Sequence, residues 1–251
     1  MKIEKFIKDK GNKYKVIIDD IEYILFDDII LKYSLLNKKI IDKSLFNEII
    51  KENEYLKNYY LVLKYISNRL RCKKEIIEYL KKKDVDDNNI SFIIEKLNDE
   101  GYLNEYVYLK SFINDSINLS DDGPLKIKKK LIKLGFNEDS IEEVLDSILL
   151  NVDLNKRVTN IISKKIRLNN NKGIYYLKRK ILLDLTNMGY NKETILDCLE
   201  SINIDDSDIY KKEKEKAIIK FSKKYSGYEL DMKVNNYLYR KGFRIGDYYE
   251  E

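Results

Sequence analysis

The chain has 251 residues, of which 43% are hydrophobic and 36% charged, with only nine Gly and one Pro. This composition favours a mainly helical fold with a sizeable core and excludes strand-rich folds, which need more turn residues. The formal net charge of +5 is too small to indicate nucleic-acid binding by itself. No apolar run approaches the roughly 20 residues that span a bilayer, and the N-terminus lacks a secretory apolar region, so we expect a cytoplasmic protein without membrane contact.

The first 26 residues differ from the rest of the chain and predict a small three-stranded β-meander. Three β-prone segments are joined by Gly11-Asn12 and Asp19-Asp20, pairs that suit tight hairpin turns. A sheet of this size is not stable alone, so we expect it to pack on helices that begin near Asp27.

A further helix over residues 44–57, with Ser44 as its N-cap, is expected to complete an N-terminal region of residues 1–57. Apolar residues then recur at helical intervals over residues 60–104, which predicts a three-helix unit. A unit of this kind buries little surface alone and is typical of a stacked array.

Pairs of apolar anchors five residues apart mark copies of this unit. The pairs recur at steps of 51, 54 and 53 residues, at Leu80 and Val85, Leu131 and Phe136, Leu185 and Tyr190, and Leu238 and Phe243. In three of the four pairs a Gly precedes the second anchor, as expected where a helix ends in a left-handed residue. We therefore predict an elongated right-handed solenoid of three-helix repeats over residues 58–103, 104–153 and 154–207, with a partial capping repeat over residues 208–251.

One helix of the second repeat has a cationic side. Pro124 fits the first turn of this helix, and Asp121 or Asp122 is expected to cap it. Its apolar stripe contains Ile127 and Leu131, and the remaining positions carry Lys126, Lys128, Lys129, Lys130 and Lys133.

The third repeat has the strongest basic signal, because no acidic residue occurs between Asp153 and Asp184. Its candidate binding residues are Lys164, Lys165, Arg167, Lys178, Arg179 and Lys180. A lysine run on one helix is usually only a solvated face. In a solenoid, however, equivalent helices align, so the basic residues of both repeats are expected to form one stripe that follows a polyanion.

Several residue types bear on chemistry. The chain has 21 Tyr, which we expect mainly in the core rather than as stacking platforms, and Cys72 and Cys198 are expected to pack as free thiols. There is no His, no Gly-rich phosphate loop and no paired-Cys metal spacing, so the sequence predicts neither an enzyme nor a cofactor or metal. Asp121 with Asp122 could hold a hard cation, but helix capping explains this pair better.

Short motifs in a fixed order resemble the RecX family of recombinase regulators. They are 69-RLRCKKEIIEYL-80, 101-GYLNE-105 and 123-GPLKIKKKLIKLGF-136, and the matching positions include Arg69, Arg71, Glu75, Gly101, Tyr102 and Leu103. The usual Arg-Pro-Arg-Ser of the family is here Arg-Leu-Arg-Cys, which removes a Pro and a capping hydroxyl.

The resemblance implies a non-enzymatic regulator of homologous recombination and the SOS response. Such a protein binds RecA in its filament on single-stranded DNA and limits strand exchange. A basic solenoid would then meet the DNA weakly and electrostatically, as a monomer. The contrasting hypothesis is a helical-repeat adaptor that binds protein without DNA contact, in which the lysines serve solubility.

Overall fold

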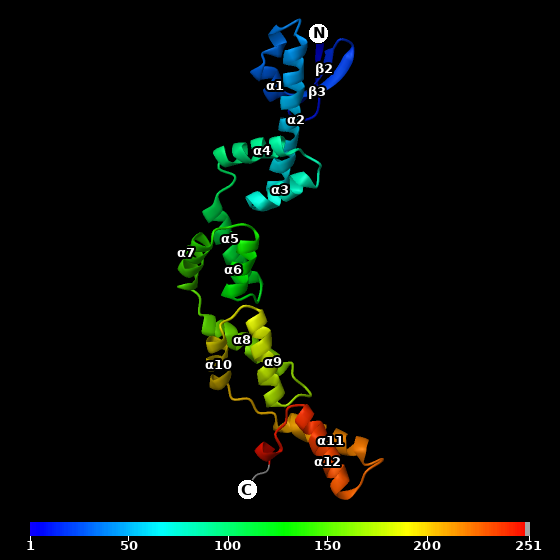
Figure 1. The fold of residues 1–251 in the computed structure, drawn as a ribbon, viewed down its shortest axis with the longest axis vertical. Coiled ribbons are helices and arrows are strands. Elements are labelled where there is room, and N and C mark those ends of the chain that lie inside the picture. Colours follow the sequence, from blue (N-terminus) through cyan, green and yellow to red (C-terminus); the bar gives the residue numbers. More distant parts are fainter. Residues whose placement is uncertain (249–251) are drawn as a thin grey trace. The chain divides into compact units, whose positions relative to one another are not determined.

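A computed structural model describes residues 1–248 of the chain as mainly helical, with a three-stranded sheet at the N-terminus (Figure 1). The predicted fold class is thereby confirmed, whereas the handedness of the array and its division into four repeats stay predictions. The chain forms two compact units, residues 1–108 and the part from Leu109 onward. The last three residues of the expected capping repeat lie outside the described residues.

The sheet is an antiparallel meander in the order β1-β2-β3, formed by Ile3–Lys8, Lys13–Ile18 and Ile21–Phe26. Asp19 and Asp20 both have positive φ, at 47° and 62°, as a two-residue hairpin turn requires. The predicted meander and its second turn are confirmed.

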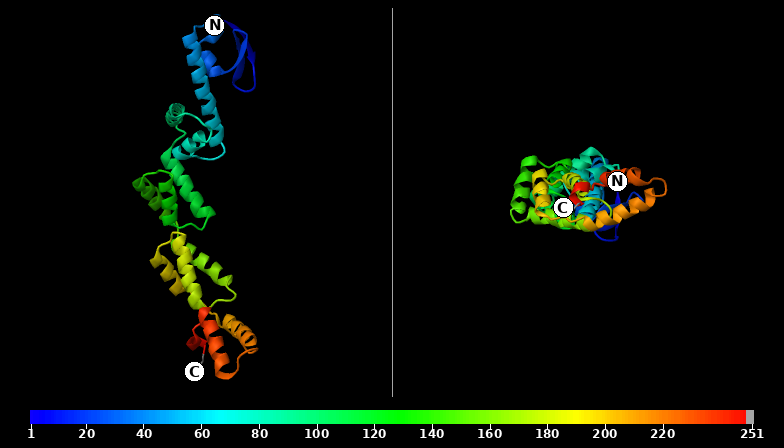
Figure 2. Two further views of the ribbon diagram at one scale, coloured as in Figure 1. Left: turned by 45° about the vertical axis from the view of Figure 1, so that its right-hand side comes forward. Right: turned by 90° about the horizontal axis from the view of Figure 1, so that it is seen from below.

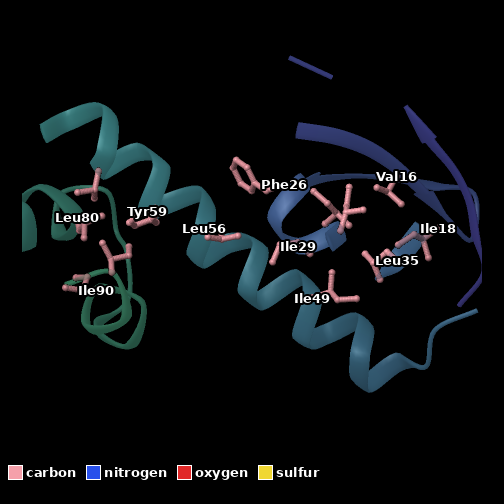
Figure 3. Close-up of a cluster of buried hydrophobic side chains, with 14 of the residues drawn as sticks. Val16, Ile18, Phe26, Ile29, Leu35, Ile49, Leu56, Tyr59, Leu80 and Ile90 are labelled. Carbon is pink, nitrogen blue, oxygen red and sulfur yellow. The ribbon is translucent and has the colours of Figure 1, made fainter. Parts of the chain in front are cut away.

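The buried face of the sheet packs on α1 (Asp27–Lys32) and α2 (Lys43–Ile66). Figure 3 shows this core continuing along α2, from Val16 and Ile18 beside the sheet to Leu80 and Ile90 beyond the middle of the helix. The small sheet thus gains its stability from the helices, as its size predicts.

The two helices expected on either side of residue 57 are one continuous helix, α2, of 24 residues. No Gly or Pro interrupts its sequence, so nothing in the local chemistry ends it. The prediction of Ser44 as N-cap is wrong: the Asp42 carboxylate caps the helix by accepting the Leu45 N–H at 2.8 Å. The proposed boundary at residue 57 therefore falls inside a helix.

The remaining elements follow in chain order. They are η1 (Leu35–Asn37), α3 (Lys73–Lys81), α4 (Asp87–Asp99), α5 (Glu105–Leu119), α6 (Pro124–Lys133), α7 (Glu138–Leu149), α8 (Leu154–Arg167), α9 (Ile174–Asn187), α10 (Lys192–Ser201), α11 (Ser207–Phe221), α12 (Gly227–Arg240) and the 3-10 turn η2 (Ile245–Tyr248).

The four anchor pairs all mark the same kind of helix end. In α6 the Phe136 N–H donates to the Leu131 carbonyl at 3.3 Å, and the Gly135 N–H donates to Ile132. This bond pair defines a Schellman motif, in which the left-handed residue is Gly135, with φ of 90°. Helices α9 and α12 end in the same way, and at the end of α3 Asp84 takes the left-handed position with φ of 56°.

The anchors differ in burial. Tyr190 and Phe243 are buried, whereas Phe136 is only half-buried. The second anchor is held by the backbone geometry of the helix end, and neighbouring elements decide separately how deeply it is covered.

Two joints in the second unit connect helices end to end: the start of α6 meets the end of α9, and the start of α9 meets the end of α12. Gly123 and Leu125, at the start of α6, donate their N–H groups to the carbonyls of Met188 (2.6 Å) and Gly189 (3.1 Å) at the end of α9. Unpaired donors of one helix end thereby satisfy unpaired acceptors of another, and the positive end of one helix dipole meets the negative end of the next.

The second joint repeats this pattern. Gly173 donates to the Lys241 carbonyl at 2.9 Å and Tyr175 donates to Gly242 at 3.3 Å, so α9 begins where α12 ends. The close approach requires Gly, since a Cβ on Gly173 would lie 2.4 Å from the Gly242 carbonyl oxygen.

The helix start predicted at Pro124 is confirmed, but its cap is Gly123 rather than Asp121 or Asp122. The N-cap position lies inside the joint, where a side chain larger than hydrogen does not fit.

The terminal hairpin of α11 and α12, whose helices lie side by side (Figures 1 and 2), has a buried carboxylate between them. Glu213 is 1% exposed and accepts hydrogen bonds from Lys216 (2.8 Å), Tyr237 (3.1 Å) and Lys241. Burial alone would raise the pKa of Glu213, but the bonds from the two lysines and the tyrosine outweigh it and lower the pKa to about 2. Glu213 therefore stays ionised in the folded protein.

Candidate nucleic-acid and partner interface

The cationic side of α6 is largely neutralised by acids from outside the helix. Lys126 pairs with Asp122 at 2.7 Å, and Lys130 pairs with the same carboxylate. Burial would raise the pKa of Asp122, but hydrogen bonds from Lys126 and Lys130 outweigh it and lower the pKa. These two candidate residues thus hold the start of α6 against its preceding loop.

Lys128 faces the acidic helix α7. It forms ion pairs with Glu138, at 2.5 Å, and with Glu142, which raise its pKa. Part of the positive charge of α6 is therefore neutralised by acidic residues of α7. Lys129 and Lys133 are exposed on the same helix.

The basic residues of α8 and α9 are more open. Lys165 pairs with Asp184 at 2.6 Å, and Lys178 is half-buried. The others are exposed and form no ion pair with any described residue: Lys164, Arg167, Arg179 and Lys180.

Arg157, also in the acid-free segment, has a structural role. Its guanidinium donates to the carbonyls of Ile117 and Ser120 at the end of α5, and to the Tyr190 hydroxyl at 2.7 Å. A planar group with several donors is well suited to unpaired carbonyls at a helix end. Arg157 is therefore committed to joining α5, α8 and the end of α9.

In the first unit, the arginines of the family motif converge on Glu75, near the start of α3. Arg69 and Arg71 contact the Glu75 carboxylate at 3.0 and 3.3 Å, and the Cys72 N–H and Tyr108 hydroxyl each donate to it at 3.0 Å. Burial opposes ionisation of Glu75, but these donors outweigh it and lower its pKa.

Glu75 thus caps the helix from its third position, although the residue at the N-cap is Cys72 rather than a hydroxyl residue. The Arg71 guanidinium also lies 4.1 Å from the centre of the Tyr65 ring, which stacks on Tyr79 at 4.0 Å. Most residues of this cluster therefore have a structural role. Of its two arginines Arg69 is the more exposed, with 65% of its side chain accessible against 15% for Arg71.

The Gly-Tyr-Leu motif ends α4. Gly101 has φ of 77° and the Tyr102 N–H donates to the Leu97 carbonyl at 2.9 Å, which is again a Schellman motif. Leu103 packs against the core of the first unit, whereas Tyr102 is half exposed. Of these three residues, Tyr102 is the one available to a partner.

A group of exposed tyrosines and arginines that was not predicted from the sequence lies beside Arg179. Tyr175, Tyr239, Arg240 and Arg244 share the lining of one hollow with it. A signal was present in the sequence: Tyr175 does not fall on the apolar stripe of α9, which follows Leu177 at intervals of four residues.

Cys72 and Cys198 are buried free thiols, as expected. No helix in the described part of the chain is long and apolar enough to cross a membrane. Within residues 1–248, no cluster of three or more Cys, Asp or Glu side chains is arranged to hold a metal ion.

Comparison with known proteins gives a consistent result. Residues 59–97 match the family model described as RecX, first three-helix domain. Regulatory protein RecX of Streptococcus agalactiae serotype Ia is 33% identical over 255 residues, which cover 98% of this chain and 96% of the relative. Regulatory protein RecX of Streptococcus pneumoniae serotype 19F is 31% identical over the same shares of both chains.

Solved structures have the same fold. A crystal structure of regulatory protein RecX matches with a TM-score of 0.67 at 22% identity, covering 78% of this chain and 98% of that one. The crystal structure of RecX from Lactobacillus salivarius matches with a TM-score of 0.52 at 27% identity, covering 59% of this chain and 96% of that one.

Proposed function

Since the chain belongs to the RecX family of regulatory proteins, we propose that it regulates homologous recombination and the SOS response by binding the RecA filament on single-stranded DNA. Binding limits strand exchange without chemical catalysis, in the cytoplasm. The observation that carries this proposal is the similarity to regulatory proteins over 98% of the chain.

Direct contact with the DNA of the filament is supported by cations that are not used within the fold. Lys129 on α6, Lys164 and Arg167 on α8, and Lys180 on α9 are exposed and form no ion pair with any residue that the structure describes. Each such residue that meets a phosphate releases condensed counterions, which favours binding at low salt. These four residues are the proposed phosphate-contacting set.

The alternative is an adaptor that binds only protein, and one observation favours it. Lys126, Lys128 and Lys130, which the sequence placed in the binding stripe, are in ion pairs with acids of the same chain. An exposed ion pair contributes only about 0–1 kcal/mol, so a DNA phosphate can displace the acidic partner. The net attraction of these lysines for DNA is nevertheless smaller than the sequence alone implies.

One experiment separates these two functions. The four residues of the phosphate-contacting set are replaced by Gln, and a control variant carries Gln at Lys5, Lys38, Lys39 and Lys43, which are exposed in the first unit. Binding to single-stranded DNA is measured against salt concentration, and inhibition of RecA strand exchange is measured with the same proteins.

If the set meets phosphates, its loss should make the log–log salt slope less negative by up to about 3, at roughly 0.7 per contact, and weaken inhibition. The control variant should behave as the parent. A set variant that inhibits strand exchange as well as the parent, with an unchanged salt slope, would favour the protein-only adaptor. Failure of the parent to bind RecA filaments at all would refute both RecA-based mechanisms.

A further inference from the structure

The joint between α9 and α12 has a hollow of about 260 Å³ beside it. Aromatic and cationic side chains dominate its lining, and none of the lining residues is acidic: the side chains around its rim are Tyr175, Tyr176, Arg179, Tyr239, Arg240 and Arg244. Three of the seven arginines in the chain therefore gather at one place, with three tyrosines.

The tyrosine rings are open to solvent. Tyr175, Tyr176 and Tyr239 are 46%, 41% and 72% exposed. The Arg244 guanidinium lies 3.2 Å from the centre of the Tyr175 ring, and the Lys172 amine lies 4.7 Å from that of Tyr176. Cations thus sit against rings that still present surface to the hollow.

The other joint of the same unit shows that the fold does not need these residues. The joint between α6 and α9 makes equivalent backbone hydrogen bonds at equivalent positions. There, the rim positions carry no aromatic ring and no arginine, but two lysines and four uncharged residues: Leu125, Lys126, Lys129, Thr186, Asn187 and Asn191. The tyrosines and arginines of the second joint are therefore additional to what holds two helices end to end.

We propose that this hollow is a stacking platform for the bases of a single-stranded nucleic acid. Unpaired bases stack on exposed aromatic side chains, and arginines hold the neighbouring phosphates with paired N–H groups. A duplex hides the faces of its bases, so the platform selects single strands.

Size and shape support this ligand over two others. The hollow is smaller than the roughly 300–1,000 Å³ of pockets that enclose small molecules, which suits a planar group lying on the surface. An acidic peptide would satisfy the arginines but offers carboxylates rather than flat rings to the three tyrosines. This inference rests on the proposed function, because the platform would hold exposed bases of the single strand in the RecA filament.

The test uses two oligonucleotides of equal length and charge, a thymidine strand and an abasic strand, with binding measured by fluorescence anisotropy. The variant Tyr175→Leu/Tyr239→Thr places at the second joint the residues that the first joint has, and leaves every charge in place. Tyr228→Leu, at an 80% exposed tyrosine at the opposite end of α12, is the control.

The parent should bind the thymidine strand more tightly than the abasic strand. The double variant should bind the thymidine strand about 5- to 150-fold more weakly for each base that stacks, with little change for the abasic strand. Tyr228→Leu should match the parent. If the double variant unfolds, the single variant Tyr239→Thr tests the same step at the most exposed ring.

Equal binding of the two strands by the parent would overturn the platform. So would a loss of affinity in the variant that is the same for both strands. Displacement of the thymidine strand by polyglutamate, with polyglutamate binding lost in the variant, would assign the hollow to an acidic protein instead.

Capture of RecA filaments is measured in parallel, because it reports on the proposed function alone. A parent that shows base-dependent affinity but captures no filament would retain the platform and refute the proposed partner.

Discussion

The end-to-end joints predict that one glycine is far less replaceable than another with the same backbone conformation. Gly189 and Gly135 have φ of 87° and 90°, so an Ala at either position pays the same left-handed strain of about 1–2 kcal/mol. A Cβ on Gly135 meets no atom within 4 Å, whereas a Cβ on Gly189 lies 2.4 Å from the Lys126 nitrogen and 2.7 Å from the Lys126 Cβ. Only Gly189→Ala forces the joint apart.

The extra cost follows from what the joint contains. Relief of the clash costs about 1–3 kcal/mol, as for overpacked sites. Separating the helix ends also weakens the hydrogen bonds from Gly123 to Met188 and from Leu125 to Gly189, each worth about 0.5–1.5 kcal/mol. We therefore expect Gly189→Ala to reduce the free energy of unfolding by about 3 kcal/mol more than Gly135→Ala does.

Urea unfolding followed by circular dichroism measures this difference. Gly123→Ala provides a second approach to the same joint, because Gly123 has no positive φ but its Cβ would lie 2.6 Å from the Gly189 carbonyl carbon. In a repeat array, loss of an interface also reduces cooperativity, so both joint variants should show a lower m-value. Equal destabilisation by Gly135→Ala and Gly189→Ala, within about 0.5 kcal/mol, would refute this account of the joint.

Three further changes test other parts of the structure. Phe243→Ala should lower the free energy of unfolding by about 3–5 kcal/mol, and Phe136→Ala by clearly less, because Phe243 is fully buried and Phe136 only half-buried. Equal losses in a urea titration would contradict this assignment. The pKa of Glu213 is about 2 in the folded protein against an ordinary 4.5. Ionised Glu213 therefore contributes about 3 kcal/mol to the free energy of unfolding, and this contribution is fully present above pH 4.5 and is lost as the pH falls through 2. Glu213→Gln should therefore lower stability at pH 7 and flatten its fall between pH 4.5 and 2; an unchanged pH profile would exclude this role. Arg157→Gln should lower the melting temperature, because charged hydrogen bonds to two carbonyls are lost, but should leave the salt slope of DNA binding unchanged. A changed slope in a stable variant would show that Arg157 contacts the DNA.

Local chemistry allowed much of the architecture to be predicted. The Asp-Asp turn of the meander, the Pro in the first turn of α6 and the glycine ends of α6, α9 and α12 depend on φ preferences that each residue has by itself. The anchor spacing of five residues had the same origin, because it joins the two ends of a Schellman hydrogen bond. Such features are visible in one sequence because they involve residues close together in the chain.

The candidate site was only partly predictable, because an ion pair depends on neighbours brought in by folding. The lysines of α6 form a run without an acid in sequence, yet Glu138 and Glu142 reach Lys128 from the next helix. Likewise, Arg157 belongs to a basic segment of the sequence, and only folding brings the carbonyls at the end of α5 beside it.

The sequence by itself determined the ends of α3, α6, α9 and α12 that the anchor pairs mark and the buried face of α6, since backbone preference and hydrophobic period act over a few residues. The tertiary structure decided which cations stay free, which glycines lie in a joint, and that Tyr175 and Arg244, 69 residues apart in the chain, lie against each other. These properties depend on the end of α12 meeting the start of α9, a contact for which no local pattern exists.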